Sequence, residues 1–271
     1  MSKNISYVKN LSLSIADNIN KSIRRRFDTL IGRQPAKKIL TRNQYKEVWN
    51  SVSQSEDDAK LAVSGYTDEN IYRQMAEATV GLLRQCVDIR KDDVFLEIGA
   101  GVGRVGSALA PLCREWIGTD VSENMVGHIR HRLAEHANVR AVTTNGFDLA
   151  AIPSESVDVV YCTVVFMHLE EWERYGYIVE GFRVLKPGGR MLVDNVNLIS
   201  DPGWKFFEEH CAIPSKERPP QMSKTSTPQE LETYFRRAGF CDIRQEQLDL
   251  WIVTHGRKPD DTVTPLNNAD V

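Results

Sequence analysis

Glycine residues are concentrated between Asp93 and Gly106, where the sequence reads DVFLEIGAGVGRVG. An apolar run that contains the acid Glu97 is followed by four glycines, which are Gly99, Gly101, Gly103 and Gly106. An apolar run of this length before glycines predicts a buried strand. Clustered glycines allow the backbone to turn sharply and a ligand to approach it closely. A strand, a glycine loop and a helix in this order predict a nucleotide-type pocket.

The glycines fit two registers, which predict different ligands. Residues 101–106 match G-x-G-x-x-G, the dinucleotide fingerprint, and Asp120 lies 19 residues after Gly101, where that fingerprint has a ribose-binding acid. The other register runs from Glu97 to Gly103. A dinucleotide brings a pyrophosphate, which suits a helix N-terminus, whereas an acid at the end of the strand suits a cationic ligand. The chemistry favours the second register, with an NAD-dependent oxidoreductase as the alternative.

The second register, Glu97-x-Gly99-x-Gly101-x-Gly103, resembles motif I of the class I S-adenosylmethionine-dependent methyltransferases. The resemblance implies a methyltransferase that binds S-adenosyl-L-methionine through these four residues and releases S-adenosyl-L-homocysteine. This cofactor carries a sulfonium cation, an ammonium group and a ribose diol but no phosphate, which agrees with an acid at position 97. Gly106 is then expected to serve close helix packing.

Other cofactor-binding residues follow from the same resemblance. Asp120 ends the second strand, where the family binds both ribose hydroxyls with an acid, and a carboxylate can accept from two donors. The resemblance also assigns Val121 and Met125 to the cofactor site, with Met125 packing on the adenine. The alternative for Asp120 is a helix-capping acid.

The loop after the third strand, TNGFDL, departs from the G-D-x-x-x-L pattern of the family. Gly146 stands where the family usually has an aspartate that binds the adenine amino group. We therefore expect Gly146 and the backbone of Phe147 to contact the adenine, with the side chains of Asn145 or Asp148 as alternatives.

The segment after the fourth strand carries the candidate catalytic residue. By resemblance, this segment, from Thr163 to Leu169, lies beside the methionine moiety of the cofactor and faces the acceptor, so Thr163 is assigned to the cofactor site. His168 is the candidate general base, because a neutral imidazole can take the proton of an acceptor hydroxyl. The alternative is a structural histidine, since family members with very different substrates carry one here.

Polar side chains also end the fifth predicted strand, at Asp194, Asn195 and Asn197. Ligands of open α/β sheets bind at the carboxyl ends of the strands, so we expect these residues to face the acceptor. The alternative is a hydrogen-bonded strand end. A metal bound with Glu170 or Glu171 is conceivable chemically, but no ligand spacing specifies one, and we predict no metal.

Two segments rich in aromatic residues lie outside the regular pattern and predict a lid that shapes acceptor choice. The first covers about residues 43–69 and offers Tyr45, Trp49 and Tyr66. The second covers about residues 198–227 and offers Trp204. An insertion as long as the second is usually functional in a compact domain.

The remaining pattern alternates strands with helices, which predicts a parallel α/β sheet. We expect strands at 94–98, 115–119, 139–143, 157–163, 190–195, 241–248 and 250–255, and helices at 70–89, 103–112, 123–135, 170–184 and 228–238. The last two strands are too close in sequence for a helical crossover and must be antiparallel. The predicted fold is a Rossmann-like, seven-stranded, mostly parallel sheet with an antiparallel C-terminal strand, helices on both faces and a helical N-terminal extension.

Composition bounds the remaining properties of the chain. It has 271 residues, of which 41% are hydrophobic and 26% charged, as in a globular protein. Its five cysteines are scattered without a CxxC pair, and no signal peptide or spanning apolar run is visible, so we predict a cytoplasmic protein. The net charge of −3 gives no whole-chain basic footprint, and we predict no nucleic-acid partner.

We expect three regions in the chain, and charge marks the first of them. Residues 1–42 carry a net charge of +8 and the rest −11. Within the basic extension, residues 11–31 have the pattern of an amphipathic helix, which could contact the body of the protein, a second copy or an anionic membrane surface. Residues 43–256 form the expected methyltransferase domain, and residues 257–271 a flexible tail. The oligomeric state stays open.

The expected reaction is methyl transfer to a hydroxyl of a small-molecule or glycan acceptor. Attack by a nitrogen or carbon of a metabolite is the alternative, as is a non-catalytic member of the family that binds the cofactor only to regulate a partner.

Overall fold

The computed structural model describes residues 44–260. The predicted N-terminal extension, its amphipathic segment 11–31 and most of the predicted tail lie outside these residues. The α-helices are α2 (Tyr45–Ser51), α3 (Glu56–Ser64), α4 (Glu69–Cys86), α5 (Arg104–Leu109), α6 (Glu123–Arg132), α7 (Glu171–Val184), α8 (Asp201–Cys211) and α9 (Pro228–Ala238). The strands are β1 (Val94–Ile98), β2 (Glu115–Asp120), β3 (Val139–Thr143), β4 (Val157–Cys162), β5 (Leu185–Asn197), β6 (Thr225–Ser226), β7 (Cys241–Leu248) and β8 (Trp251–Arg257).

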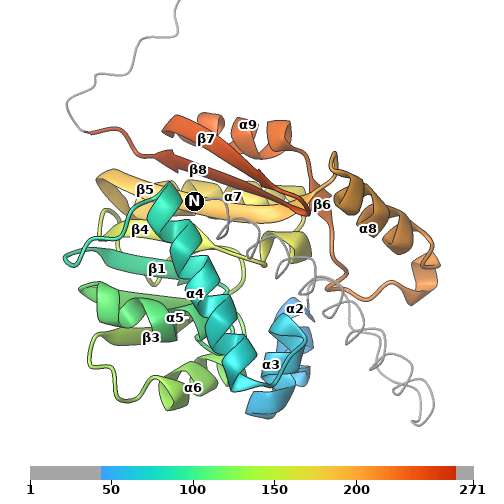
Figure 1. Ribbon diagram of the computed structural model, residues 1–271, viewed down its shortest axis with the longest axis horizontal. Coiled ribbons are helices and arrows are strands. Elements are labelled where there is room, and N and C mark those ends of the chain that lie inside the picture. The colour runs from blue at the N-terminus through green and yellow to red at the C-terminus, as the bar shows by residue number, and fades with distance from the viewer. Residues whose placement is uncertain (1–43, 261–271) are drawn as a thin grey trace, which may run out of the picture.

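The strands form one sheet in the order β3-β2-β1-β4-β5-β8-β7 (Figure 1). Strand β8 lies antiparallel between β5 and β7, and the other pairs along the sheet are parallel. The predicted architecture is thus confirmed, except that the sheet has eight strands. The extra strand, β6, consists of two residues that pair with Val196 and Asn197 of β5, and two residues are too few to give a periodic signal.

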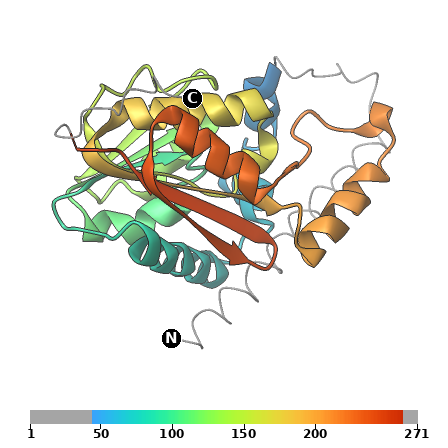
Figure 2. The ribbon, with the colours of Figure 1, turned by 90° about the horizontal axis from the view of Figure 1, so that it is seen from above.

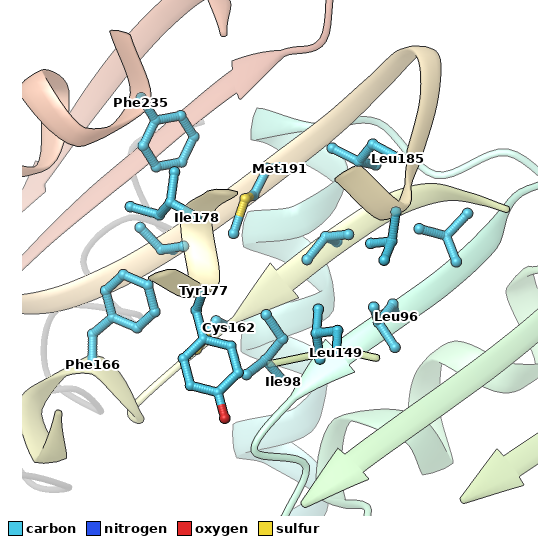
Figure 3. Close-up of a cluster of buried hydrophobic side chains, with 14 of the residues drawn as sticks. Leu96, Ile98, Leu149, Cys162, Phe166, Tyr177, Ile178, Leu185, Met191 and Phe235 are labelled. Carbon is cyan, nitrogen blue, oxygen red and sulfur yellow. The ribbon is translucent and has the colours of Figure 1, made fainter. Parts of the chain in front are cut away.

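Helices cover both faces of the sheet, with α7 and α9 on one side and α4 on the other (Figure 2). Alternate residues of a strand point to opposite faces, so the core divides into two large apolar clusters. In one, Ile178 of α7 and Phe235 of α9 pack on Leu96, Cys162 and Met191 of the strands (Figure 3). In the other, α4, α5 and α6 pack on the opposite face of the same strands.

The fifth strand starts earlier than predicted. The segment LKPGG at residues 185–189 precedes the strand expected at 190–195 and is a bulged part of β5, because pairing with β4 shifts register between Val157 and Val159. The Lys186 ammonium donates to both carboxylate oxygens of Asp158 at 2.8 Å and ties the bulge to β4. The start of the predicted tail is also ordered: β8 continues through Arg257, and Lys258 N–H donates to Gly189 O.

Sequence signals located the helix ends well. Ser122 and Thr227 cap α6 and α9 as their positions suggest, and Gly239 ends α9 with a φ of 102°. Thr227 and Glu230 stand three residues apart, as in a capping box, but the Glu230 carboxylate accepts from the Arg174 guanidinium at 3.0 Å. A buried guanidinium needs a charged partner, and this need outweighs the local cap.

Helices α2 and α3, in the first predicted lid segment, are fastened to the body by charge pairs. Glu56 in α3 accepts from the Arg132 guanidinium at 2.6 Å, and Arg132 also contacts Glu69 at 2.9 Å. Lys60 binds both acids and is 5% exposed. Lys60 and Arg132 are largely shielded from water whereas Glu69 is exposed, so the pairs of the two cations with Glu56 hold α3 against α6 more firmly than fully exposed pairs would.

Gly106 packs against Trp116, which explains why the dinucleotide fingerprint is matched without being used. A Cβ at Gly106 would lie 2.5 Å from the indole ring of Trp116. We expect Gly106→Ala to lower the free energy of unfolding by about 1–3 kcal/mol through overpacking, measured by urea denaturation. Gly81, in helix α4, has no atom near its Cβ position, and Gly81→Ala is the control, which should not destabilise. Equal stability of the two variants would contradict the packing role.

Candidate functional site

A cavity of about 970 Å³, counted to its open mouth, lies where β1, β2 and β4 end. Of the residues singled out from the sequence, it is lined by Tyr45, Trp49, Glu97, Gly99, Gly101, Asp120, Val121, Met125, Gly146, Thr163 and His168. Helices α2 and α3 supply its outer wall through Tyr45, Trp49 and Val63. The structure therefore brings the glycine loop, the strand-end acids, the histidine and the first lid segment to one place.

The glycine loop between β1 and α5 needs glycine for two reasons. Gly99, Gly101 and Gly103 have φ values of 69°, 55° and 79°, which side chains rarely adopt. At Gly99 a Cβ would also meet Val165 Cγ2 at 2.4 Å. Gly103 differs from the other two because it begins α5 and packs near Leu133 instead of lining the cavity. The loop thus leaves its backbone bare toward the cavity at Gly99 and Gly101.

Asp120 links the glycine loop to the start of α6. Its Oδ2 accepts from Gly101 N–H at 3.0 Å and its Oδ1 accepts from Ser122 N–H at 2.9 Å. Part of the residue is exposed in the cavity, but the carboxyl is held in the interior, and burial raises its pKa to about 6 against the effect of these hydrogen bonds. Asp120 is therefore both a cap of the loop and an acceptor at the cavity wall.

Glu97 is held by a buried chain of hydrogen bonds. Trp116 Nε1–H donates to the Tyr161 hydroxyl at 2.8 Å, and that hydroxyl donates to Glu97 Oε2 at 2.6 Å. Indole can only donate, and the phenol in turn donates its proton to Glu97. Burial raises the pKa of the Glu97 carboxyl to about 8, although the Tyr161 hydrogen bond and the Arg104 charge act in the opposite direction. A cation in the cavity would favour its ionised form.

This raised pKa gives the cofactor-free protein a pH-dependent stability. The folded protein holds the Glu97 proton up to about pH 8, whereas the ordinary pKa is 4.5, so the contribution of this group to stability falls between these values and then levels off. We expect Glu97→Gln to become increasingly more stable than the wild type as the pH rises from 5.5 to 8.5, measured by Tm. A difference in Tm that is constant over this range would rule out Glu97 as the source. S-adenosylmethionine is a cation and would favour the ionised form of Glu97. Its binding should therefore reduce the loss of stability at high pH.

Thr163 places an unused hydrogen-bonding group in the cavity wall. The residue follows β4 and is 8% exposed, and its Oγ1 has no hydrogen-bonding partner among the described residues. A buried hydroxyl without a partner is costly. A polar ligand in the cavity would provide the missing partner.

His168 lies in the cavity wall on a short 3-10 helix (Phe166–His168). Its Nδ1 is 2.8 Å from the carbonyl oxygen of Gln221, its ring lies edge-on to Trp49 at 5.1 Å, and its carbonyl accepts from the Tyr45 hydroxyl at 3.3 Å. A carbonyl only accepts, so Nδ1 carries the proton and the neutral ring has its lone pair on Nε2. The second lid segment thus reaches the site through the backbone of Gln221.

Besides Gly103, six predicted site residues do not line the cavity. Asn195 donates to Ser226 Oγ at 2.8 Å, and Asn197 Oδ1 accepts from Ile199 N–H at 3.3 Å, so both fasten the chain around the end of β5. Asp194 accepts from Val164 N–H at 2.7 Å and is 7% exposed. The remaining three are Tyr66, Phe147, which is 68% exposed, and Trp204, which is 50% exposed. Of the residues predicted to contact the adenine at this loop, which are Gly146, Phe147, Asn145 and Asp148, Gly146 is the one that lines the cavity.

The structure adds cavity residues that the sequence did not reveal. Tyr72 of α4 and Arg104 of α5 line the cavity, as does Tyr177 of α7. Arg104 stands inside the glycine motif, so its position was a signal. Tyr72 and Tyr177 lie on helices whose patterns indicate only burial, and no signal separates them from core residues.

The cavity fits the chemistry of S-adenosylmethionine. Glu97 offers a carboxyl to a cationic group, Asp120 offers acceptors to a diol, and Arg104 offers a cation to a carboxylate. Met125 and Val121 supply apolar walls, and the unpartnered Thr163 hydroxyl remains for a polar atom. Within residues 44–260, no group of three or more metal-binding side chains is found. In the same part of the chain no helix is long and apolar enough to cross a membrane.

Comparison with known proteins agrees with this site. Residues 96–193 match a family described as "Methyltransferase domain". The uncharacterized methyltransferase YcgJ of Bacillus subtilis is 26% identical over 75% of this chain and 82% of its own length. Phosphoethanolamine N-methyltransferase 1 of Caenorhabditis elegans is 24% identical over 73% of this chain, which spans only 37% of that protein.

A solved structure shares the fold. Magnesium protoporphyrin IX methyltransferase from Synechocystis PCC 6803 with bound S-adenosylhomocysteine superposes with a TM-score of 0.60 at 15% identity, over 79% of this chain and 98% of that chain.

Proposed function

Because the chain belongs to the class I S-adenosylmethionine-dependent methyltransferases, we propose that it methylates a hydroxyl group of a small-molecule or glycan acceptor, with His168 as the general base. Methyl transfer from S-adenosylmethionine itself is the activity of the family. The acceptor oxygen is the proposed part. The observation that carries it is the hydrogen bond between His168 Nδ1 and the Gln221 carbonyl, which leaves a basic Nε2 on a residue of the cavity wall.

The residues of the cavity divide the work between binding and proton transfer. S-adenosylmethionine, when bound, supplies an electrophilic methyl group with a neutral leaving group. Glu97, Asp120 and the glycine loop would hold it, and α2 and α3 limit the access of water. His168 would take the proton of the acceptor hydroxyl as its oxygen becomes bonded to the methyl carbon. Holding the two reactants in line supplies much of the remaining acceleration.

An amine acceptor is the second candidate. The phosphoethanolamine N-methyltransferase among the relatives favours it, and the aromatic rings of Tyr45 and Trp49 beside His168 could bind a cationic amine. An amine that reaches the site in its neutral form needs no base before attack, whereas one that binds as a cation must first lose a proton. Only a neutral amine therefore differs from a hydroxyl acceptor in its need for His168.

The test is an acceptor screen that measures release of S-adenosylhomocysteine from the full chain. The panel pairs each hydroxyl compound with the amine of the same carbon skeleton, and mass spectrometry locates the added methyl group. The proposal expects turnover with hydroxyl compounds. Turnover confined to amines would replace it with N-methylation, and cofactor binding without turnover of any acceptor would favour a non-catalytic role.

A further inference from the structure

Val164, between β4 and His168, has an unusual backbone conformation. Its φ is 62°, in the left-handed region. Five non-glycine residues in the described part of the chain have a positive φ, and Val164 alone among them is β-branched, the others being Asp88, Glu155, Asp242 and Asp249. For a β-branched residue this conformation is a genuine outlier. Such strain persists only where the surroundings enforce it, and it is concentrated at functional sites.

Asp194 is the group that enforces it. Its Oδ1 accepts from Val164 N–H at 2.7 Å, which is a short hydrogen bond. Asp194 is buried in β5, where its backbone is paired with Val253 of β8, so the carboxyl is carried by a rigid part of the sheet. The residue does not line the cavity, whereas Val164 does. Asp194 therefore has a direct hydrogen-bonding link to the cavity wall through the backbone of Val164.

Both neighbours of Val164 depend on this turn. Thr163, which precedes it, presents the unpartnered hydroxyl to the cavity. Val165, which follows it, packs its side chain into the space that a Cβ at Gly99 would fill, and its carbonyl accepts from His168 N–H at 2.8 Å. A change of φ at Val164 would move the Thr163 hydroxyl, the wall behind the glycine loop and the start of the helix that carries His168.

We infer that Asp194 is a positioning residue, which holds Val164 in a strained left-handed turn and so fixes the Thr163 hydroxyl and Val165 for cofactor binding. The place of Asp194 at the end of a strand predicts a direct contact with the methyl acceptor, and the positioning role replaces that expectation. It needs a hydrogen-bond acceptor at position 194 and does not need a charge. The inferred role of Asp194 concerns cofactor binding, so it holds whichever molecule accepts the methyl group.

The first test asks whether position 194 needs a hydrogen-bond acceptor or a negative charge. It measures the Kd of S-adenosylhomocysteine by titration calorimetry. Asp194→Ala should weaken binding about tenfold, as for a buried N–H that loses its hydrogen-bond acceptor. Asp194→Asn can still accept from Val164 N–H and should bind within about threefold of the wild type. If Asp194→Asn binds as weakly as Asp194→Ala, the carboxylate charge is what matters and the inference is wrong.

The second test relieves the strain. Asparagine tolerates the left-handed region, whereas threonine has the shape of valine and is equally β-branched. Adding Val164→Asn to Asp194→Ala should therefore recover most of the lost affinity, and adding Val164→Thr should not. Each double variant is compared with its own Val164 single variant, because residue 164 lines the cavity. Equal affinities of the two double variants, after this correction, would overturn the inference.

A third measurement applies even if Asp194→Ala fails to fold. With Asp194 intact, Val164→Asn should give a higher Tm than Val164→Thr in the cofactor-free protein, because only the first removes strain. A Tm of Val164→Asn at or below that of Val164→Thr would show that the turn stores no strain. Failure here would leave the acceptor proposal untouched, since no acceptor is used.

Discussion

His168→Ala should lower turnover by about a hundredfold to ten-thousandfold, the usual contribution of a positioned general base, while the Kd of S-adenosylhomocysteine changes little. The reason is the division of roles in the cavity. His168 is fixed by Gln221, Trp49 and Tyr45 rather than by the cofactor-binding loop. Removing its ring takes away the proton acceptor and leaves Glu97 and Asp120 in place.

The measurement needs an accepted hydroxyl substrate, with kcat and KM determined by release of S-adenosylhomocysteine. His131→Ala is the matched control, because His131 is exposed on α6 and outside the cavity. It should leave turnover unchanged. If His168→Ala retains wild-type turnover at all pH values, His168 is a structural histidine and the acceptor needs no base from this residue. If it loses cofactor affinity as well, its main role is to support the cavity wall.

Asp120→Ala should weaken binding of S-adenosylhomocysteine about a hundredfold, which corresponds to the loss of two hydrogen bonds to a charged group. Two effects act together in this variant. The acceptors for a ribose diol are lost, and Gly101 N–H and Ser122 N–H lose the carboxylate that they now share. The loop and α6 would therefore separate more easily at the edge of the cavity.

Titration calorimetry measures this effect directly and needs no acceptor. Asp148→Ala is the control, because Asp148 is likewise an acid in a loop after a strand, caps Ala150 N–H at 3.0 Å and does not line the cavity. It should bind with wild-type affinity. Similar losses in both variants would mean that loop order in general limits binding, and wild-type affinity in Asp120→Ala would leave Asp120 as a helix cap only. The pH adds a check: burial raises the pKa of Asp120 to about 6, so the difference between wild type and Asp120→Ala should shrink below pH 6.

The order of elements and the class of cofactor could be predicted because they depend on local patterns. The boundaries of α9 and β7 follow from Thr227, Gly239 and alternating apolar residues, and the structure places them at the predicted residues. The antiparallel position of β8 follows from the short link between Leu248 and Trp251. The misjudged elements depend on pairing: β6 is too short to be periodic, and the LKPGG segment joins β5 only because β4 accepts its bulge.

The residues on the methyl-acceptor side of the site could not be predicted from local patterns. Asp194, Asn195 and Asn197 looked equivalent as polar groups at the end of a strand, but successive side chains of a strand point to opposite faces. Which face meets a cavity depends on the elements that cover it. Here Ser226 and Ile199 engage the asparagines and Val164 engages the aspartate, so none of the three reaches the cavity.

The sequence by itself pointed to a site for S-adenosylmethionine, because the acid and the glycines from Glu97 to Gly103 are neighbours along the chain and form a recognisable motif. Only the tertiary structure decided how the other groups are used. Tyr72 becomes a cavity residue because α4, which covers one face of the sheet, brings it to the cavity. The neutral ring of His168 has its lone pair on Nε2 because a carbonyl 53 residues away meets Nδ1. Contacts between residues distant in sequence leave no periodic trace, so packing alone defines these roles.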